Sequence, residues 1–305
     1  MCAYLGEYWA DRLPRSSMKV IGLVSGGKDS IFNLLECVRL GHTIVCIANL
    51  HPPADNKGGE EEIVQELDSY MFQTVGHTAI EALGAAMGLP LVRRATRGKA
   101  LSTGVQYDAM VGQRISKPSA DTAMCGDEVE DMLLLVRDCL ALFPDATAVS
   151  SGAILSSYQR TRVEHVCGRL GLTSLGFMWR RRQPPLLRSM VNSGLDAALI
   201  KVSSYGLKPS HVGCSLGDMV PFLLAGQADF GLNVCGEGGE YESFCRHCPG
   251  LYAKGKVEFV RHVRIDRSKD EYSPDSHMAI LEARAVGPDG AVLGPVPLPA
   301  PRAAP

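Results

Sequence analysis

Long apolar runs and an excess of charge of either sign are both missing from this sequence. No apolar run approaches the roughly 18 residues that a membrane helix needs, so we expect no membrane span. The 305 residues include 31 basic and 33 acidic side chains, for a net charge of −2. A chain so close to neutral has no overall attraction to nucleic acid, and we expect no direct nucleic-acid binding. The local cluster of Arg180 to Arg182 indicates a solvated face or a site for an anionic partner more than it indicates RNA binding.

The ten cysteines form no dense disulfide framework, and the first 17 residues contain no apolar core of signal-peptide length. Scattered cysteines in a chain without a secretory leader are typical of reduced thiols in the cytoplasm. Cys245 and Cys248 have CxxC spacing, but no matching second pair supplies the four ligands of a zinc site. We therefore expect structural thiols there, a cytoplasmic protein, and a disordered extension over residues 1–17.

A chain of this length, with 46% hydrophobic residues, is globular and can hold two domains or one large one. Residues 19–24 (KVIGLV) are typical of a buried parallel strand, and the apolar residues after Ser30 recur at helical spacing. Residues 43–50 (TIVCIANL) form a second apolar run beyond that helix. The pattern predicts a right-handed βαβ unit at the start of an α/β fold with a parallel sheet.

The sequence SGGKDS, Ser25 to Ser30, lies between the first strand and its helix. Gly26 and Gly27 allow the backbone to approach an anion closely, and the start of the helix offers free N–H groups and the positive end of its dipole. Lys28 adds a point charge, and the two terminal serines add hydroxyl donors. A Walker A loop needs Ser or Thr after its lysine to hold Mg²⁺, whereas Asp29 stands here. The stretch predicts a phosphate site of another kind.

Ligands of open parallel sheets bind at the edge where the strands end. Asn49 and Leu50 end the second strand, where an adenine could pack against the backbone, and a plain strand end is the alternative. The predicted fourth strand, residues 146–151, runs into Gly152 at the same edge. Tyr158 and Arg160 follow it and could reach the nucleotide or its substrate.

Residues 236–242 (GEGGEYE) place three carboxylates among three glycines, a composition that disfavours both helix and strand. A tight loop of this kind could aim Glu237 and Glu240 at a cation, an ammonium ion or a polar substrate. An acidic surface turn is an equally good interpretation of this stretch alone.

These motifs together resemble the diphthine-ammonia ligase family, within the pyrophosphate-loop class of N-type ATP pyrophosphatases. The resemblance runs from Met18 to about Pro249 and rests on SGGKDS (25–30), ELDSYMFQTVGH (66–77), GDEVED (126–131), GAILSSYQRTRVE (152–164) and CGEGGEYES (235–243). It implies a Rossmann-like, HUP-type ATP-binding domain over residues 18–155 and a smaller α/β substrate domain over 156–286. Residues 287–305 are expected to be a disordered tail.

The resemblance also implies an activity, the ATP-dependent amidation of diphthine to diphthamide on translation elongation factor 2. Free ammonium would supply the nitrogen, and the products would be AMP and pyrophosphate. In this interpretation the cofactors are ATP and Mg²⁺, with ATP held by residues 25–30, by Asn49 and Leu50 and by Gly152. Asp29 would bind the metal, while Lys28 would act on the phosphates.

For the remaining residues, the interpretation assigns Glu237 and Glu240 to ammonium capture or substrate orientation. Tyr158 and Arg160 are assigned to the acyl-adenylate. The family usually has Asp where this chain has Ser157, so one carboxylate is missing. Two alternatives stay open. One is a tRNA-modifying pyrophosphate-loop ligase, which the Arg180 to Arg182 cluster could serve, and the other is a module that binds ATP without turnover, which fits the loss of a catalytic carboxylate at Ser157.

Overall fold

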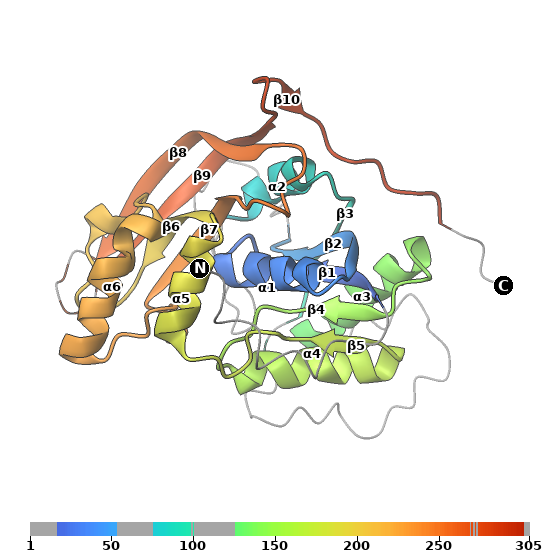
Figure 1. The fold of residues 1–305 in the computed structure, drawn as a ribbon, viewed down its shortest axis with the longest axis horizontal. Coiled ribbons are helices and arrows are strands. Elements are labelled where there is room, and N and C mark those ends of the chain that lie inside the picture. Colours follow the sequence, from blue (N-terminus) through green and yellow to red (C-terminus); the bar gives the residue numbers. More distant parts are fainter. Residues whose placement is uncertain are drawn as a thin grey trace.

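We describe the protein from a computed structural model, which covers residues 17–53, 76–98, 100, 126–268, 270, 272 and 274–301 (Figure 1). The predicted N-terminal extension lies outside the described residues except for Ser17, and so does most of the motif at 66–77. Among the helices that are described, none is both long enough and apolar enough to cross a membrane.

The first sheet consists of five parallel strands in the order β3-β2-β1-β4-β5 (Figure 1). Its strands are β1 (Lys19–Leu23), β2 (Thr43–His51), β3 (Leu91–Ala95), β4 (Ala148–Ser150) and β5 (Thr173–Leu175). The chain reverses its direction of winding between β1 and β4, which makes the ends of these strands the ligand-binding edge of the sheet. The predicted α/β fold with a Rossmann-like parallel sheet is confirmed.

Helices cover both faces of this sheet, and strand residues alternate between the two faces. On one face Val20 and Ile47 contribute to a core with α1 (Lys28–Arg39) and α2 (Ile80–Met87), which a short 3-10 turn (His77–Ala79) precedes. On the other face Ile21, Cys46 and Val149 pack against α3 (Glu128–Leu142) and α4 (Ser157–Leu170). Side chains that alternate along a strand give a sheet two buried faces only when helices cover both.

The helices begin where the sequence provides side-chain caps. Asp127 accepts a hydrogen bond from the Val129 amide at the start of α3, and Ser156 accepts one from Gln159 at the start of α4. Each cap satisfies an N–H group that the helix itself leaves without a partner. Both helices therefore begin at fixed points beside the strand ends.

The second sheet is antiparallel where its strands pair, in the order β10-β9-β6-β7, with β8 also paired to β9. Its strands are β6 (Asp196–Val202), β7 (Tyr241–His247), β8 (Lys256–Ser268), β9 (Asp275–Val286) and β10 (Val292–Leu293). The helices α5 (Gln183–Asn192) and α6 (Leu216–Phe230) and a 3-10 turn (Pro209–His211) complete this half. The structure thus contains the predicted second α/β unit.

Two of the predicted boundaries differ from the structure. The boundary at residue 155 is wrong for the first sheet, because α4 and β5 follow it and β5 is the fifth strand of that sheet. The tail predicted from residue 287 is ordered in part, since β10 pairs with the end of β9 before the chain runs outward (Figure 1). The antiparallel turn between β9 and β10 provides backbone hydrogen bonds that the composition of this stretch did not reveal.

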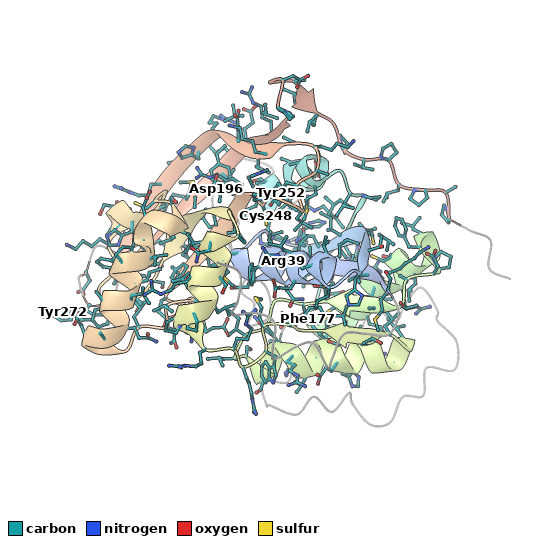
Figure 2. The ribbon with its side chains drawn as sticks, in the orientation of Figure 1. Arg39, Phe177, Asp196, Cys248, Tyr252 and Tyr272 are labelled. Atoms are coloured by element: carbon teal, nitrogen blue, oxygen red, sulfur yellow. The ribbon has the colours of Figure 1, made fainter. Side chains whose placement is uncertain are left out.

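One hydrophobic core joins the two sheets. It contains residues of β1 and α1 together with residues of β6 and β7, and Phe244 of β7 is fully buried in it. Cys248 and Tyr252 also belong to this core, and Figure 2 shows them in the interior, whereas Tyr272 lies at the outer edge. The pocket described next lies between elements that this shared core holds together.

Candidate active site

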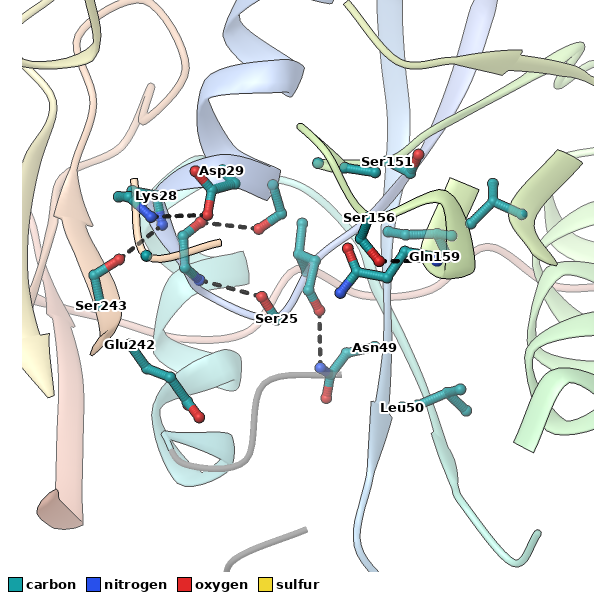
Figure 3. A pocket seen from close by; sticks show the side chains of 18 of the residues that line it. Ser25, Lys28, Asp29, Asn49, Leu50, Ser151, Ser156, Gln159, Glu242 and Ser243 are labelled. Carbon is teal, nitrogen blue, oxygen red and sulfur yellow. Dashed lines mark hydrogen bonds and ion pairs between the residues drawn. The ribbon is translucent and has the colours of Figure 1, made fainter. Parts of the chain in front are cut away.

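A pocket of about 350 Å³ opens at the ends of β1, β2 and β4 (Figure 3). This volume is in the range of ordinary small-molecule and cofactor sites. Figure 3 shows Lys28, Glu242 and Ser243 on one side of it, Ser151, Ser156 and Gln159 on the other, and Asn49 and Leu50 along one end. The lining residues are Leu23, Val24, Ser25, Gly27, Lys28, Asp29, Ser30, Ala48, Asn49, Leu50, His77, Met132, Leu135, Ser151, Gly152, Ala153, Ser156, Gln159, Val163, Gly236, Glu237, Gly239, Tyr241, Glu242 and Ser243.

The loop at 25–30 is held in place by β7, a strand of the other sheet. The Cys245 amide donates to the Gly26 carbonyl at 2.8 Å, and the Lys28 amide donates to Ser243 Oγ at 3.2 Å. Gly26 has φ +88°, and a Cβ on it would lie 2.6 Å from Cε2 of Phe244. Only glycine combines this backbone conformation with such close packing. Gly26 therefore supports the loop from behind and does not itself line the pocket.

Lys28 is the positive centre of the pocket. Its Nζ donates to Asp29 Oδ2 at 2.9 Å and to the Cys235 carbonyl at 2.5 Å, and it lies 4.9 Å from the centre of the Tyr241 ring. Burial alone lowers the pKa of a lysine, but the charge of Asp29, with contributions from Tyr241 and Cys235, outweighs burial and raises the pKa of Lys28 above its ordinary value. The ammonium group therefore stays charged at the start of α1.

Asp29 has a carboxylate oxygen with no assigned partner. Oδ2 accepts from Lys28, whereas Oδ1 is buried and has no hydrogen-bond partner among the described residues. A buried carboxylate oxygen without a donor is costly unless a cation binds it. Oxygen ligands of this kind are what Mg²⁺ prefers beside phosphates, so this residue fits the metal that was predicted for it.

The loop after β4 closely approaches the start of α1. A Cβ on Gly152 would lie 2.6 Å from the Ser30 amide nitrogen and 2.7 Å from the Asp29 carbonyl carbon. Glycine is therefore required here by the proximity of another backbone rather than by its own φ angle. The close approach fixes the loop after β4 against the start of α1, where both line the pocket.

Asn49 and Leu50 lie at the pocket as predicted. The Asn49 side chain is buried, donates from Nδ2 to the Val24 carbonyl at 2.9 Å, and accepts at Oδ1 from Arg93 Nε at 3.2 Å. Its amide thus ties the end of β2 to the end of β1 and to β3. Both residues shape the end of the pocket where a base was expected to pack.

Glu237 also lines the pocket, from the glycine-rich turn that precedes β7. Its Oε2 accepts from the Leu155 amide at 2.7 Å, which links the glycine-rich turn to the loop after β4. Burial, with the charge of Asp29 as the second cause, raises the pKa of the Glu237 carboxyl above its ordinary value. The structure therefore brings Glu237 into the same pocket as Lys28 and Asp29, from which it is separated by more than 200 positions in the sequence.

Three predicted site residues do not reach the pocket. Glu240 accepts from Asn233 and from the Gly238 amide, so that both of its carboxylate oxygens are used inside its own turn. Tyr158 donates to Glu128 at 3.3 Å, and Arg160 pairs with Glu164 at 2.7 Å on the exposed side of α4. The sequence pattern could not separate Glu237 from Glu240, because both follow a glycine in the same turn.

Other residues of the pocket were missed by the sequence analysis. His77 lies buried in a 3-10 turn and lines the pocket. Gln159 and Ser156 lie at the start of α4, and Glu242 and Ser243 at the start of β7. Ser156 and Gln159 belong to the motif GAILSSYQ, and Glu242 and Ser243 belong to the motif CGEGGEYES. Membership in these two motifs was the sequence signal that could have identified them as pocket residues.

Comparison with known proteins supports one family. No family model matches the chain. Proteins named diphthine-ammonia ligase from Bos taurus and Danio rerio are 44% and 45% identical to it, over 87% and 84% of this chain and 91% and 92% of their own lengths. A protein of the same name from Schizosaccharomyces pombe is 43% identical over 85% of this chain but only 41% of its own length. The chain belongs to the diphthine-ammonia ligase family.

Proposed function

We propose that the protein uses ATP and ammonium to convert diphthine to diphthamide on translation elongation factor 2, through an acyl-adenylate, with release of AMP and pyrophosphate. The observation that carries the proposal is the pocket that Lys28 and the start of α1 line together with the half-buried Glu237. The names of the relatives give the reaction class, a carbon-nitrogen ligase that acts on diphthine. The cysteines described in the structure are free thiols, which fits the cytoplasm as the site of the reaction.

A carboxylate resists attack by ammonia, and adenylation gives it a good leaving group. In the first step the diphthine carboxylate oxygen bonds to the α phosphorus of ATP while the bond to pyrophosphate breaks. The charge that develops on pyrophosphate lies, in this proposal, against the amides at the start of α1 and the ammonium of Lys28. Fixed donors of this kind stabilise the transition state because they need no reorganisation.

Asp29 is the residue that would hold Mg²⁺, through the oxygen that has no other partner. The metal, when bound, would neutralise part of the phosphate charge. Lys28 donates to the other oxygen of the same carboxylate, so it does not occupy the oxygen that would bind the metal.

Glu237 is the residue that would bind ammonium and accept a proton as the amide forms. In the second step ammonia attacks the acyl carbon, the bond to AMP breaks, and one proton must leave the nitrogen. A carboxyl with a raised pKa is better suited to take that proton than an ordinary glutamate. Glu240 has the different role of shaping the turn that presents Glu237, and Tyr158 and Arg160 are not part of this chemistry.

The reaction is tested with purified protein, ATP, ammonium and elongation factor 2 that carries diphthine. We expect release of AMP and pyrophosphate that requires both ammonium and the diphthine-bearing factor. Release of AMP that requires tRNA instead would support the tRNA ligase, and ATP binding without any AMP would support the binding module. Neither alternative is favoured by the relatives, which share one name.

A further inference from the structure

An aromatic residue beside the pocket is covered by two arginines. The guanidinium carbon of Arg160, on α4, lies 4.6 Å from the centre of the Trp179 ring, and that of Arg180 lies 5.5 Å from it. Cation-π contacts of this length are attractive, and they fix the direction of flexible side chains. We refer to Arg160, Trp179 and Arg180, together with Arg182 two positions further along the chain, as the Trp179 cluster.

Arg180 has an unusual backbone conformation. Its φ is 57°, and it is the only non-glycine residue with positive φ in the part of the chain that the structure describes. A left-handed conformation is unfavourable for a residue with a Cβ, because the Cβ comes too close to the following carbonyl oxygen. The Arg180 amide donates to the Ile154 carbonyl at 2.8 Å, which holds the turn in this form. A strained residue held by its surroundings, with a charged side chain, suggests a function for that charge.

The Trp179 cluster is attached to the rim of the pocket through residues 152–156. Gly152, Ala153 and Ser156 line the pocket, while Ile154 binds Arg180 and the Leu155 amide binds Glu237. The Leu155 side chain is 46% exposed. One short loop therefore connects the proposed ammonium site, an exposed apolar side chain and the cluster.

Two charges of the cluster are not neutralised by the protein. Arg160 pairs with Glu164, and the neighbouring Arg181 pairs with Glu36 at 3.4 Å. Arg180 and Arg182 are exposed, and within the described ranges no carboxylate forms an ion pair with either of them. Arginine and tryptophan are the residue types that most often dominate the binding energy of protein interfaces.

From these observations we infer that the Trp179 cluster docks an acidic segment of the protein substrate, next to the modified residue that enters the pocket. The inference rests on the proposed function. A side chain on a folded protein can reach the pocket only if the chain on either side of it lies on the rim, where Leu155 and the cluster are exposed. Opposite charge on that flanking segment would orient it and speed its association.

The test compares AMP release by the wild-type protein with that of Arg180→Gly, Arg182→Glu and the double variant, at varied concentrations of diphthine-bearing elongation factor 2. Arg180→Gly removes the charge and also relieves the positive φ, so the fold should be retained. We expect the KM for the protein substrate to rise about tenfold in the double variant, while kcat and the KM for ATP stay unchanged. The difference should shrink as salt is added, because exposed charges are screened. Arg137→Glu, at an exposed arginine on α3, is the control and should leave all three constants unchanged.

Direct binding of the labelled factor to each variant, without turnover, separates this inference from the proposed function. If the wild-type protein releases no AMP, the proposed function fails, yet a weaker Kd in the double variant still supports docking at the cluster. An unchanged Kd for the factor overturns the docking inference even if turnover is normal. Loss of tRNA binding in the double variant, with the factor bound as before, also overturns it.

Discussion

The role of each charged residue in the pocket depends on its hydrogen-bond partners, as Lys28, Asp29 and Glu237 illustrate. Lys28 is buried against a carboxylate and a carbonyl, which keeps it protonated at the start of α1. Glu237 is half-buried and accepts a hydrogen bond from the Leu155 amide, whereas both carboxylate oxygens of Glu240 accept hydrogen bonds within its own turn. Chemistry at this site therefore depends on which polar atoms remain available after folding.

Replacing Lys28 with alanine removes the charge that would stabilise departing pyrophosphate. We expect kcat/KM for AMP formation to fall by about 100-fold to 1000-fold, the range seen when one fixed donor is removed. Lys19→Ala is the matched control, because Lys19 forms only an exposed ion pair with Asp145 and should leave the rate unchanged. Equal rates for the two variants would contradict the phosphate role of Lys28.

Replacing Glu237 with glutamine tests its raised pKa through stability. A carboxyl with a raised folded-state pKa contributes stability that is complete below its ordinary value near 4.5 and is lost as pH rises through the folded-state pKa. The glutamine does not titrate. The free energy of unfolding of the variant minus that of the wild type should therefore increase as pH rises from about 4.5. Denaturant titrations at several pH values measure this difference, and a constant or decreasing difference would show that burial does not raise the pKa.

At the level of elements, the phosphate loop depends on a strand from the far end of the chain. The strand, loop and helix at 19–39 were predictable because strand pattern, glycines and helical spacing are all local in the sequence. The support of the loop by β7 was not predictable from local patterns, since Lys28 and Ser243 are separated by 215 positions in the sequence. The pattern that placed Tyr158 and Arg160 near the nucleotide gave the correct loop but not the direction in which the helical side chains point.

Adding a methyl group at Gly152 should separate the loop after β4 from α1. Because the nearest atoms belong to the backbone of Asp29 and Ser30, neither side can yield easily, and we expect Gly152→Ala to cost about 1 to 3 kcal/mol and to weaken ATP binding. Gly168→Ala, inside α4 and with open space around it, should instead raise stability by about 0.5 to 1 kcal/mol. Thermal unfolding with and without ATP measures both variants, and similar effects of the two substitutions would refute the close approach.

At the level of the whole molecule, one core joins two sheets that the sequence analysis assigned to separate domains. The predicted boundary at 155 followed the motifs, but α4 and β5 continue the alternation of the first sheet to Leu175. Nothing in a local apolar pattern states which sheet a strand will join. The fold class was therefore predictable, and the division between the two halves was not.

Phe244 gives a test of this joint core. It is fully buried between the loop and the second sheet, so Phe244→Ala should cost about 3 to 5 kcal/mol. Because the core is shared, hydrogen exchange should accelerate in β1 as much as in β7. Phe222→Ala, at a partly exposed site on α6, should change stability by only about 0.5 kcal/mol. Faster exchange confined to the second sheet would show that the two halves unfold independently.

In the proposed reaction, the amides at the start of α1 and Lys28 hold the diphosphate that leaves ATP. A crystal structure with Mg²⁺ and an ATP analogue that cannot be cleaved between its α and β phosphates tests this most directly. We expect the β and γ phosphates to lie within hydrogen-bond distance of the 26–30 backbone and of Lys28 Nζ, with the α phosphate facing the side of the pocket where Glu237 lies. An analogue bound elsewhere in the molecule, or bound here with its phosphates directed away from this loop, would contradict it.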